Sequence, residues 1–347
     1  MKTLFKSSNN TTGFKRPCRG NKLKLRTVSV RSTSMTEQVD KDGVSIRRRP
    51  PSGGDRQACG PFDFRVTGLD DNKPRNILEE IVWWKAKEID YMREKQSLAL
   101  LKAMVNSAPP ARDFKAAIMK KAGETGKPGL IAEVKKASPS KGVIQPDFDP
   151  VRIAKAYEEG GAACLSVLTD EKFFQGSFDN LRLIRAAGVQ CPLLCKEFVV
   201  EAYQVFKGRA CGADAVLLIA SVLPNQDMAY LMKVAASLNM QCLIEVHSVE
   251  ELERMLLLPD IEKNILGINN RDLQTFKVDL ANTKNIMDSE AGKQVKERGI
   301  LMVGESGIFT PDDVAFVQNA GVGAILVGES LVKQGDPALG IKQLLTL

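Results

Sequence analysis

Short apolar runs alternate with longer, partly polar segments from residue 130 to the end of the chain. Runs that are apolar at almost every position are typical of strands covered on both faces, as in a parallel sheet packed between helices. Eight such runs are present, at residues 130–134, 163–168, 193–195, 215–219, 242–246, 265–268, 300–303 and 324–327. The pattern therefore predicts eight parallel strands, each followed by a helix.

The segments between these runs carry the start and stop signals of helices. Capping residues that favour a helix start stand at Asp149 before Pro150, at Ser248 with Glu251, and at Thr310 before Pro311. Gly160, Gly188 and Gly321 stand where helices should end. Eight strand–helix units fit an α/β fold of the (βα)8 TIM barrel type, whose usual length is about 250 residues. A doubly wound open sheet is the rival, but it would favour a GxGxxG turn after its first strand, and none stands there.

The residues before the first run predict additional N-terminal helices. Apolar residues recur every three or four positions along one helical face, at Leu78, Val82, Ala86, Ile89 and Met92. A second, shorter helix is expected over 113–121, ending near Gly123. Residues 41–60 are polar and rich in Arg, Gly and Pro, so we expect no ordered structure before about residue 70. The predicted organisation is a presequence with linker over 1–70 and a single barrel domain over 71–347.

The formal net charge of +7 is concentrated at the front of the chain. Residues 1–36 contain nine Lys or Arg, eleven Ser or Thr and no Asp or Glu, so the rest carries 40 basic and 42 acidic residues. A basic, hydroxyl-rich segment without a long apolar stretch predicts an organelle transit peptide and not a secretory signal. A basic tail that binds nucleic acid or anionic lipid is the alternative. The residues after 36 carry almost no net charge, so we expect no nucleic-acid partner. The chain contains no run of eighteen apolar residues, so we expect no membrane span.

The cysteine and histidine content limits the possible chemistry. The seven cysteines form no CxxC pair, and Cys164, Cys195 and Cys242 lie within apolar runs, which indicates small buried side chains in a reducing compartment. The one histidine, His247, cannot form a metal cluster by itself. Acid–base chemistry therefore falls to Lys and Glu.

Polar side chains interrupt or end the apolar runs at the end where a barrel places its active site. Charged groups beside a packed core are costly unless they are paired or contact a ligand. These residues are Glu133, Lys135, Lys196, Glu245, Asn269, Arg271 and Glu305. A structural layer of salt bridges would explain any one of them, but so many at one end favour a catalytic site.

Glycine-bearing turns follow the last two apolar runs, as Gly304-Glu305-Ser306-Gly307 and Gly328-Glu329-Ser330. Barrels commonly bind phosphate at these loops, where glycines let backbone N–H groups approach an anion. Each glycine alone could serve only a tight turn. Two such turns at the expected strands favour a phosphorylated small-molecule substrate.

Several segments together resemble the indole-3-glycerol-phosphate synthase family. The first is Ile131-Ala-Glu-Val-Lys-Lys-Ala-Ser-Pro-Ser140, which is similar to the family's signature on its first strand. Further matching segments follow in order at 166–177, 194–198, 243–247, 267–273 and 303–307. The resemblance covers roughly residues 75–347 and not the presequence, which resembles the plant form. A presequence of this kind implies location in the chloroplast stroma, with the plastid import machinery as a partner.

The resemblance implies a reaction of tryptophan biosynthesis without a metal or organic cofactor. The family converts 1-(2-carboxyphenylamino)-1-deoxyribulose 5-phosphate into indole-3-glycerol phosphate, carbon dioxide and water. Lys196 would be the main general acid at the ketone, with Lys135 as a second acid or anion partner. Glu245 and Glu133 would transfer protons in the dehydration. The resemblance also makes Asn269 an orienting residue for Glu133 or a substrate hydroxyl.

The remaining residues implied by the resemblance bind substrate. Arg271 and Ser138 would hold the carboxylate and neighbouring polar groups, and Phe174 would pack on the anthranilate ring, although loop packing explains Phe174 nearly as well. The two glycine-bearing turns add Glu305, Ser306, Gly307, Gly328 and Glu329 to the expected substrate-binding residues. Bacterial relatives often have a small residue at the position of Glu329. Only the backbone N–H of Glu329 is therefore expected to bind the phosphate.

Two other functions remain open at this point. One is another phosphosugar barrel of the same pathway, phosphoribosylanthranilate isomerase or the tryptophan synthase α subunit, which the trio Glu133, Lys135 and Ser138 disfavours. The other is a non-catalytic barrel that binds a phosphorylated metabolite. Such a protein would tolerate loss of the acid–base set, whereas the whole set is present.

Overall fold

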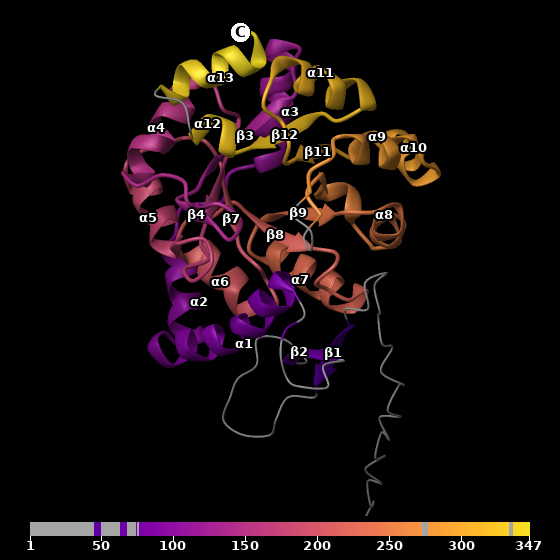
Figure 1. Cartoon of the computed structure of the whole chain (residues 1–347). Coiled ribbons are helices and arrows are strands. Elements are labelled where there is room, and N and C mark those ends of the chain that lie inside the picture. The colour runs from indigo at the N-terminus through magenta and orange to yellow at the C-terminus, as the bar shows by residue number, and fades with distance from the viewer. Residues whose placement is uncertain (1–44, 50–62, 68–73, 75, 273–276, 333–335) are drawn as a thin grey trace, which may run out of the picture. The chain divides into compact units, whose positions relative to one another are not determined.

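Eight parallel strands close into a barrel, as the sequence predicts (Figure 1). The computed structural model describes residues 45–49, 63–67, 74, 76–272, 277–332 and 336–347. Around the barrel the order of strands is β10-β11-β12-β3-β6-β7-β8-β9, and every neighbouring pair is parallel. Their bounds are β3 Gly129–Val134, β6 Cys164–Leu168, β7 Leu193–Lys196, β8 Ala215–Ile219, β9 Gln241–Val246, β10 Ile265–Asn269, β11 Met302–Glu305 and β12 Ala324–Val327.

One strand begins two residues later than predicted. We expected a strand over 300–303, but β11 starts at Met302. The N–H of Ile300 donates to the carbonyl of Val295 in the preceding helix at 3.0 Å. Ile300 therefore belongs to the turn that ends this helix, and its apolar side chain is explained by burial there.

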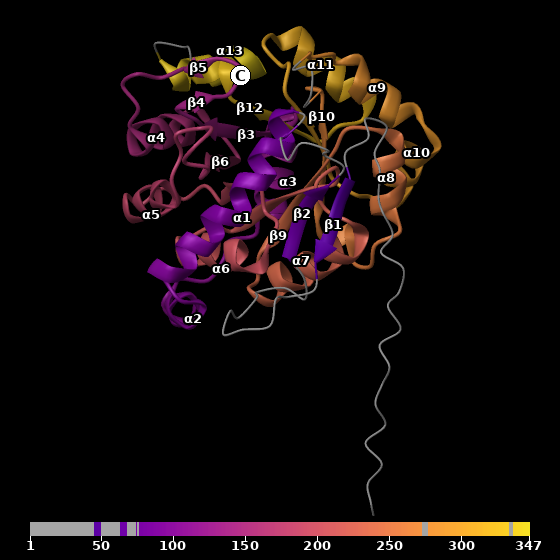
Figure 2. The ribbon, with the colours of Figure 1, turned by 60° about the horizontal axis from the view of Figure 1, so that its bottom comes forward.

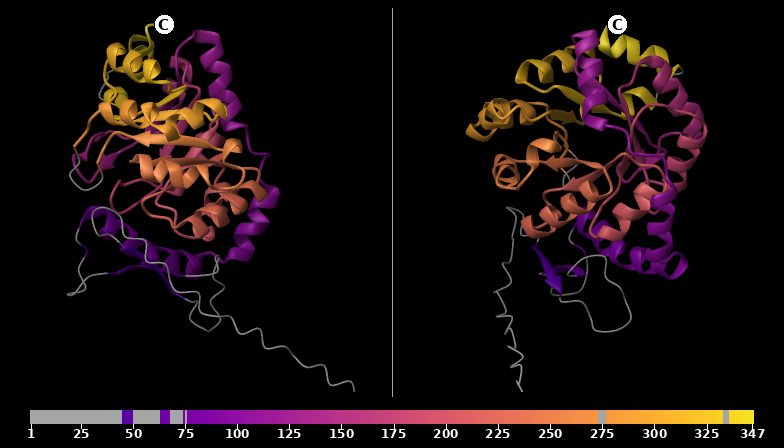
Figure 3. Two further views of the ribbon diagram at one scale, coloured as in Figure 1. Left: turned by 90° about the vertical axis from the view of Figure 1, so that its right-hand side faces the viewer. Right: turned by 180° about the vertical axis from the view of Figure 1, so that it is seen from behind.

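Helices surround the strands on the outside of the barrel (Figures 2 and 3). They are α4 Pro150–Gly160, α5 Phe178–Ala186, α6 Ala202–Ala210, α7 Asn225–Ser237, α8 Val249–Leu256, a 3-10 turn Ile261–Lys263, α9 Ala281–Asp288, α10 Glu290–Glu297, α11 Pro311–Ala320, α12 Glu329–Val332 and α13 Pro337–Leu345. The predicted caps Asp149, Ser248 and Thr310 each accept hydrogen bonds from the first turn of their helix. Gly321 ends α11 in the left-handed conformation, whereas Gly161 rather than Gly160 does so for α4.

Three helices precede the barrel strands in the described part of the chain, where the sequence predicted two. They are α1 Ile77–Lys95, α2 Leu98–Ser107 and α3 Phe114–Thr125. We missed α2 because its residues are almost all apolar or neutral, with no contrasting polar face, and only Leu101 among them is buried. The third helix extends past Gly123 and ends at Gly126, whose φ of 67° suits a helix terminus.

The segment before residue 70 is not wholly without secondary structure, contrary to our expectation. Strands β1 (Ser45–Arg49) and β2 (Asp63–Thr67) pair antiparallel, with Ser45 opposite Thr67. The low content of apolar residues gave no signal for this pairing. The predicted transit peptide, residues 1–36, lies outside the described residues.

The barrel strands are buried along nearly their whole length, which explains their continuous apolar pattern. The described cysteines Cys164, Cys191, Cys195, Cys211 and Cys242 are free thiols. All but Cys211 are buried, as the sequence predicted for those within apolar runs. No helix among the described residues combines the length and apolar character that a membrane crossing requires.

Candidate active site

One pocket opens at the carboxyl ends of the strands, and its lining contains every predicted site residue. Helix α1 supplies part of the wall through Ile77, Leu78 and Ile81, which the sequence analysis did not assign to the site. The predicted residues in the lining are Glu133, Lys135, Ser138, Phe174, Lys196, Glu245, Asn269, Arg271, Glu305, Ser306, Gly307, Gly328 and Glu329. The end of the barrel that the sequence indicated is therefore where these side chains meet.

Lys196 stands between two buried carboxylates. Its Nζ lies 3.0 Å from Oε2 of Glu305 and 3.2 Å from Oε2 of Glu245. Lys196 and Glu305 are the last residues of β7 and β11, and Glu245 is the residue before the last in β9, so strands far apart in sequence bring them together. Two of the three N–H bonds of the ammonium group are thus directed to the protein, and one is available for a substrate oxygen.

The pKa values of this triad are shifted in different directions. Burial alone would lower the pKa of Lys196, but the charges of Glu305, Glu245 and Glu133 raise it above the ordinary value. Burial would raise the pKa of Glu245, yet Lys196, His247 and a hydrogen bond from Asn269 lower it. Burial, with the charge of Glu245, raises the pKa of Glu305 to about 7. Of the three groups, Glu305 is the one whose pKa is drawn towards neutrality.

Glu133 and Lys135 form a second ion pair at the end of β3. Gly328, directly after β12, provides the space for this glutamate: a Cβ at position 328 would lie 2.5 Å from Oε1 of Glu133. From the sequence, Gly328 was expected to bind the phosphate. The structure gives a second reason for glycine at this position: a side chain here would displace the carboxylate of Glu133, a catalytic candidate.

Asn269 and His247 both contact Glu245. The side chain of Asn269 hydrogen-bonds to Glu245 and not to Glu133, which was one of its two expected partners beside a substrate hydroxyl. Its Oδ1 accepts from the N–H of Arg271 at 3.0 Å. His247 Nε2 lies 3.5 Å from Oε1 of Glu245. From the sequence we used His247 only to exclude a metal cluster, and its position two residues after Glu245 is the signal that could have placed it here.

Two aromatic rings face each other in the pocket. The ring centroids of Phe174 and Phe198 are 6.0 Å apart, with an interplanar angle of 36°. Phe198 was missed, although it belongs to the same segment as Lys196. Both residues line the pocket, so a flat aromatic substrate group would find two rings to pack against.

The glycine-bearing loops after β11 and β12 adopt conformations suited to exposing backbone N–H groups. Ser306 and Gly307 have φ of 65° and 80°, and a Cβ at Gly307 would lie 2.4 Å from Cγ1 of Val278. The carboxylate of Glu329 lies 3.4 Å from Nζ of Lys141. This pairing gives the Glu329 side chain a cationic partner, consistent with the expectation that only its N–H serves an anion.

Ser138 belongs to a short hairpin in the loop after β3. Strands β4 (Ala137–Ser138) and β5 (Gly142–Val143) pair antiparallel within this loop. The carbonyl of Ser138 accepts a hydrogen bond from the N–H of Lys141 at 3.3 Å. The hairpin thereby joins Ser138, on the pocket wall, to the partner of Glu329.

Comparisons with known proteins find relatives over most of the chain. A sequence model of indole-3-glycerol phosphate synthase matches residues 78–344. The chain is 53% identical over 323 residues to the chloroplastic indole-3-glycerol phosphate synthase of Arabidopsis thaliana, covering 93% of this chain and 80% of the relative. It is 56% identical over 302 residues to the enzyme of that name from Microcystis aeruginosa, covering 87% and 98%. For the one from Rippkaea orientalis the identity is 51% over 301 residues, covering 87% and 99%.

Proposed function

The chain belongs to the indole-3-glycerol phosphate synthase family, and we propose that its pocket performs the family's ring closure with the residues described above. The substrate is 1-(2-carboxyphenylamino)-1-deoxyribulose 5-phosphate, which loses carbon dioxide and water. The observation that carries the assignment of roles is the position of Lys196 between Glu245 and Glu305. Family membership decides against the isomerase and the tryptophan synthase α subunit as alternatives.

Ring closure requires a donor at the ketone oxygen while the aromatic carbon attacks the ketone carbon. Lys196 stays an ammonium group near neutral pH, because three carboxylates raise its pKa. It donates its remaining N–H to the ketone oxygen and stabilises the negative charge that develops there. The carbon bearing the carboxylate forms the new bond, and carbon dioxide then leaves to restore the aromatic ring.

The proton transfers fall to the carboxylates around Lys196. Glu305 has a pKa of about 7, so it both donates and accepts protons efficiently near neutral pH. We propose that it returns a proton to Lys196 once the ketone oxygen has become a hydroxyl group. Glu245 and Glu133 remove and deliver the protons of the dehydration, and Lys135 neutralises Glu133 as its ion-pair partner.

Substrate binding divides the pocket into two parts. The phosphate is held by backbone N–H groups of Ser306, Gly307 and Glu329, where the loops after β11 and β12 meet. The anthranilate ring packs against Phe174 and Phe198. Arg271 and Ser138, on the same lining, hold the carboxylate and adjacent hydroxyl groups.

We also propose that the enzyme works in the plastid. The composition of residues 1–36, with nine basic and no acidic residues, supports a transit peptide. The name of the Arabidopsis thaliana relative contains the word chloroplastic, which supports the same location. Fusing residues 1–60 to a fluorescent reporter should direct it to plastids, and a cytosolic reporter would reject the proposal.

A direct assay tests the activity. Purified full-length chain is incubated with the carboxyphenylamino-deoxyribulose phosphate, and the fluorescence of the indole product is followed. We expect turnover without added metal. A well-folded protein that binds the substrate and forms no indole product would leave the non-catalytic phosphometabolite-binding barrel as the function.

A further inference from the structure

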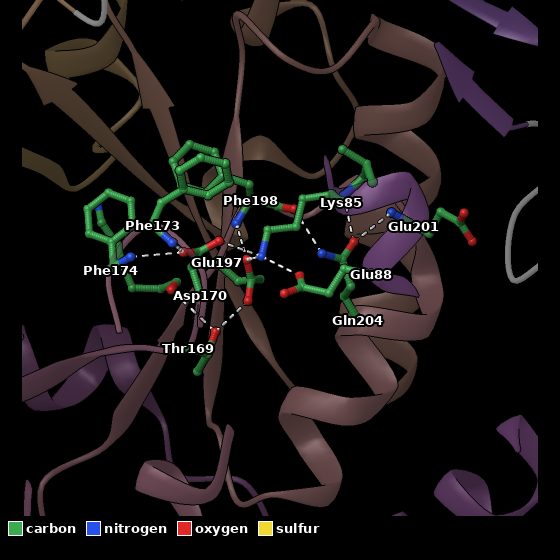
Figure 4. A network of polar contacts seen from close by, with 12 residues as sticks. Lys85, Glu88, Thr169, Asp170, Phe173, Phe174, Glu197, Phe198, Glu201 and Gln204 are labelled. Carbon is green, nitrogen blue, oxygen red and sulfur yellow. Dashed lines mark hydrogen bonds and ion pairs between the residues drawn. The ribbon is translucent and has the colours of Figure 1, made fainter. Parts of the chain in front are cut away.

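A closed network of charged groups lies beside the pocket, where α1 meets the chain that follows β6 and β7 (Figure 4). Its centre is the ammonium group of Lys85, whose side chain has no exposed surface. Nζ lies 2.7 Å from Oδ2 of Asp170, 2.8 Å from Oε1 of Glu197 and 2.6 Å from Oε2 of Glu88. The ammonium group therefore forms ion pairs with three carboxylates.

Asp170 connects this network to the loop after β6. Its Oδ1 accepts hydrogen bonds from the N–H of Phe173 at 2.6 Å and of Phe174 at 3.0 Å, while Oδ2 contacts Lys85. The carboxylate is completely buried. Since Asp170 holds the backbone of Phe174, the place of that ring in the pocket depends on the place of Asp170.

Glu197 connects the network to the end of β7. Its Oε1 accepts from the N–H of Phe198 at 2.8 Å, and its Oε2 accepts from the hydroxyl of Thr169 at 2.9 Å. The N–H of Thr169 in turn donates to the carbonyl of Lys196 at 3.1 Å. Glu197 thus holds the peptide units on either side of it, including the residue that carries the catalytic ammonium.

A buried ion pair can act only to stabilise the packing of a helix against a barrel. In that case its removal would change the stability of the fold and not the catalytic constants. The network around Lys85 does more than join α1 to the strands, because both of its fully buried carboxylates bind the backbone of aromatic pocket residues. The same helix supplies Ile77, Leu78 and Ile81 to the pocket wall. A change at Lys85 can therefore affect the pocket through Asp170, through Glu197 and through the position of α1.

We propose that Lys85 is a positioning residue for the reaction: through Asp170 and Glu197 it fixes the two aromatic rings, Phe174 and Phe198, that hold the substrate's anthranilate group, and the backbone of Lys196. The inference rests on the proposed function of this pocket. Lys85 and Asp170 do not line the pocket. Glu197 does, together with Phe174, Phe198 and Lys196. Its effect is therefore expected on binding of the aromatic part of the substrate and not on binding of phosphate.

The test compares Lys85→Met with Arg185→Met in the full chain. Arg185 contacts the buried carboxylate of Asp214, which directly precedes β8 at the opposite end of the barrel. Both changes remove a cation from a buried pair, but only the first reaches the pocket. For Lys85→Met we expect kcat/KM per folded molecule to fall at least about tenfold, mostly through KM, with little change in inhibition by inorganic phosphate. Arg185→Met should lower the melting temperature and leave both kinetic constants unchanged.

A second variant keeps the proposal testable if Lys85→Met does not fold. Glu197→Gln keeps the shape of the side chain and leaves a carbonyl oxygen to accept from the N–H of Phe198. It removes one negative charge from a cluster in which three carboxylates surround one ammonium group. We expect a folded protein with kcat/KM reduced about fivefold or more in the same pattern. Kinetic constants equal to those of the parent, in either variant, would overturn the proposal. A parent enzyme that forms no indole product would instead reject the proposed function.

Discussion

The two ends of the barrel both bury charged groups, but they satisfy them differently. At the amino end, Oδ1 of Asp214 accepts from the N–H of Arg112 at 2.8 Å, and Oδ2 accepts from the N–H of Leu193 at 2.7 Å and pairs with Arg185. At the carboxyl end, Oε2 of Glu305 contacts Lys196. Its other oxygen, Oε1, is buried and accepts no hydrogen bond from the described residues.

This difference separates a structural cluster from a reactive one. A carboxylate whose oxygens are all occupied is fixed in one place and one protonation state, which stabilises a fold. A buried carboxylate with an unused oxygen and a shifted pKa is costly to the fold, and such groups concentrate at sites of chemistry. The carboxylate of Asp214 is therefore fully bonded at the amino end, whereas the incompletely bonded carboxylate of Glu305 lies in the pocket.

The largest expected effect is the loss of turnover in Lys196→Met. Without the ammonium at the ketone, kcat should fall about 10²-fold to 10⁴-fold. The free energy of unfolding should fall by less than the roughly 3–5 kcal/mol typical of a broken buried pair, because Glu305 takes up a proton near neutral pH. Steady-state kinetics and urea unfolding check both statements. Lys196→Arg is the control: it should keep the charge and the fold, yet an active arginine variant would contradict the role of donor.

At the opposite end, Asp214→Ala should affect stability and nothing else. It removes a carboxylate that three groups contact, so the free energy of unfolding should fall by about 3–5 kcal/mol. The kcat and KM of the folded protein should match those of the parent, since Asp214 does not line the pocket. Kinetic changes at a temperature where the variant is fully folded would break the contrast between the two ends.

The pKa of Glu305 makes the contrast measurable through pH. Burial raises it from 4.5 to about 7, so this carboxyl contributes stability that is fully present below about pH 4.5 and is lost as pH rises through about 7. Glu305→Gln does not titrate, and should therefore gain on the parent by roughly 2–4 kcal/mol across that window. Urea unfolding at several pH values between 4.5 and 8 gives the difference, and a difference independent of pH would contradict the shifted pKa.

A smaller effect is expected from Gly328→Ala. The added Cβ would lie 2.5 Å from Oε1 and 3.1 Å from Cβ of Glu133, so it displaces that carboxylate and should lower kcat/KM about tenfold to a hundredfold through both constants. If Gly328 served the phosphate alone, only KM would rise. Gly304→Ala is the matched control in β11, because its nearest neighbour, Cβ of Val317, would be 3.7 Å from the new atom, an ordinary contact.

The sequence predicted the barrel and the composition of the pocket because both depend on local pattern. Continuous apolar runs specify the covered strands, and a residue such as Lys196 at the end of a run must lie at the mouth of a barrel. What it could not predict is which side chains pair across the mouth. The partner of Asn269 is Glu245 on the neighbouring strand β9, and not Glu133 on β3. This choice depends on how the side chains turn at the barrel mouth, which the apolar pattern does not specify.

The contributions of the N-terminal helices were beyond sequence reasoning for a similar reason. The spacing of Leu78, Val82 and Ile89 predicted α1, and all three are buried. Lys85 lies among them as an apparent surface charge, because lysine is almost never fully buried without partners. Its partners Asp170 and Glu197 are distant in sequence, so only the tertiary structure reveals it as the centre of a buried network.

The smallest expected effect concerns Lys141, whose half-exposed side chain lies 3.4 Å from the carboxylate of Glu329. A surface pair of this kind contributes at most about 1 kcal/mol, so Lys141→Gln should leave the free energy of unfolding nearly unchanged. Its KM should nevertheless rise about twofold to fivefold at low ionic strength. The reason is that Glu329 then faces the substrate phosphate without the cation that offsets its charge.

The effect of Lys141→Gln should disappear at high salt, since about 0.5 M of a monovalent salt screens charges separated by more than about 4 Å. Lys155→Gln supplies the control, because Lys155 is exposed on α4 and its replacement changes the net charge equally without touching Glu329. If both variants shift KM by the same factor at low salt, the effect comes from the overall charge of the protein, and the phosphate does not bind beside Glu329. If only Lys141→Gln shifts KM, the loop after β12 holds the anion through its backbone while the side chain of Glu329 is held aside by Lys141.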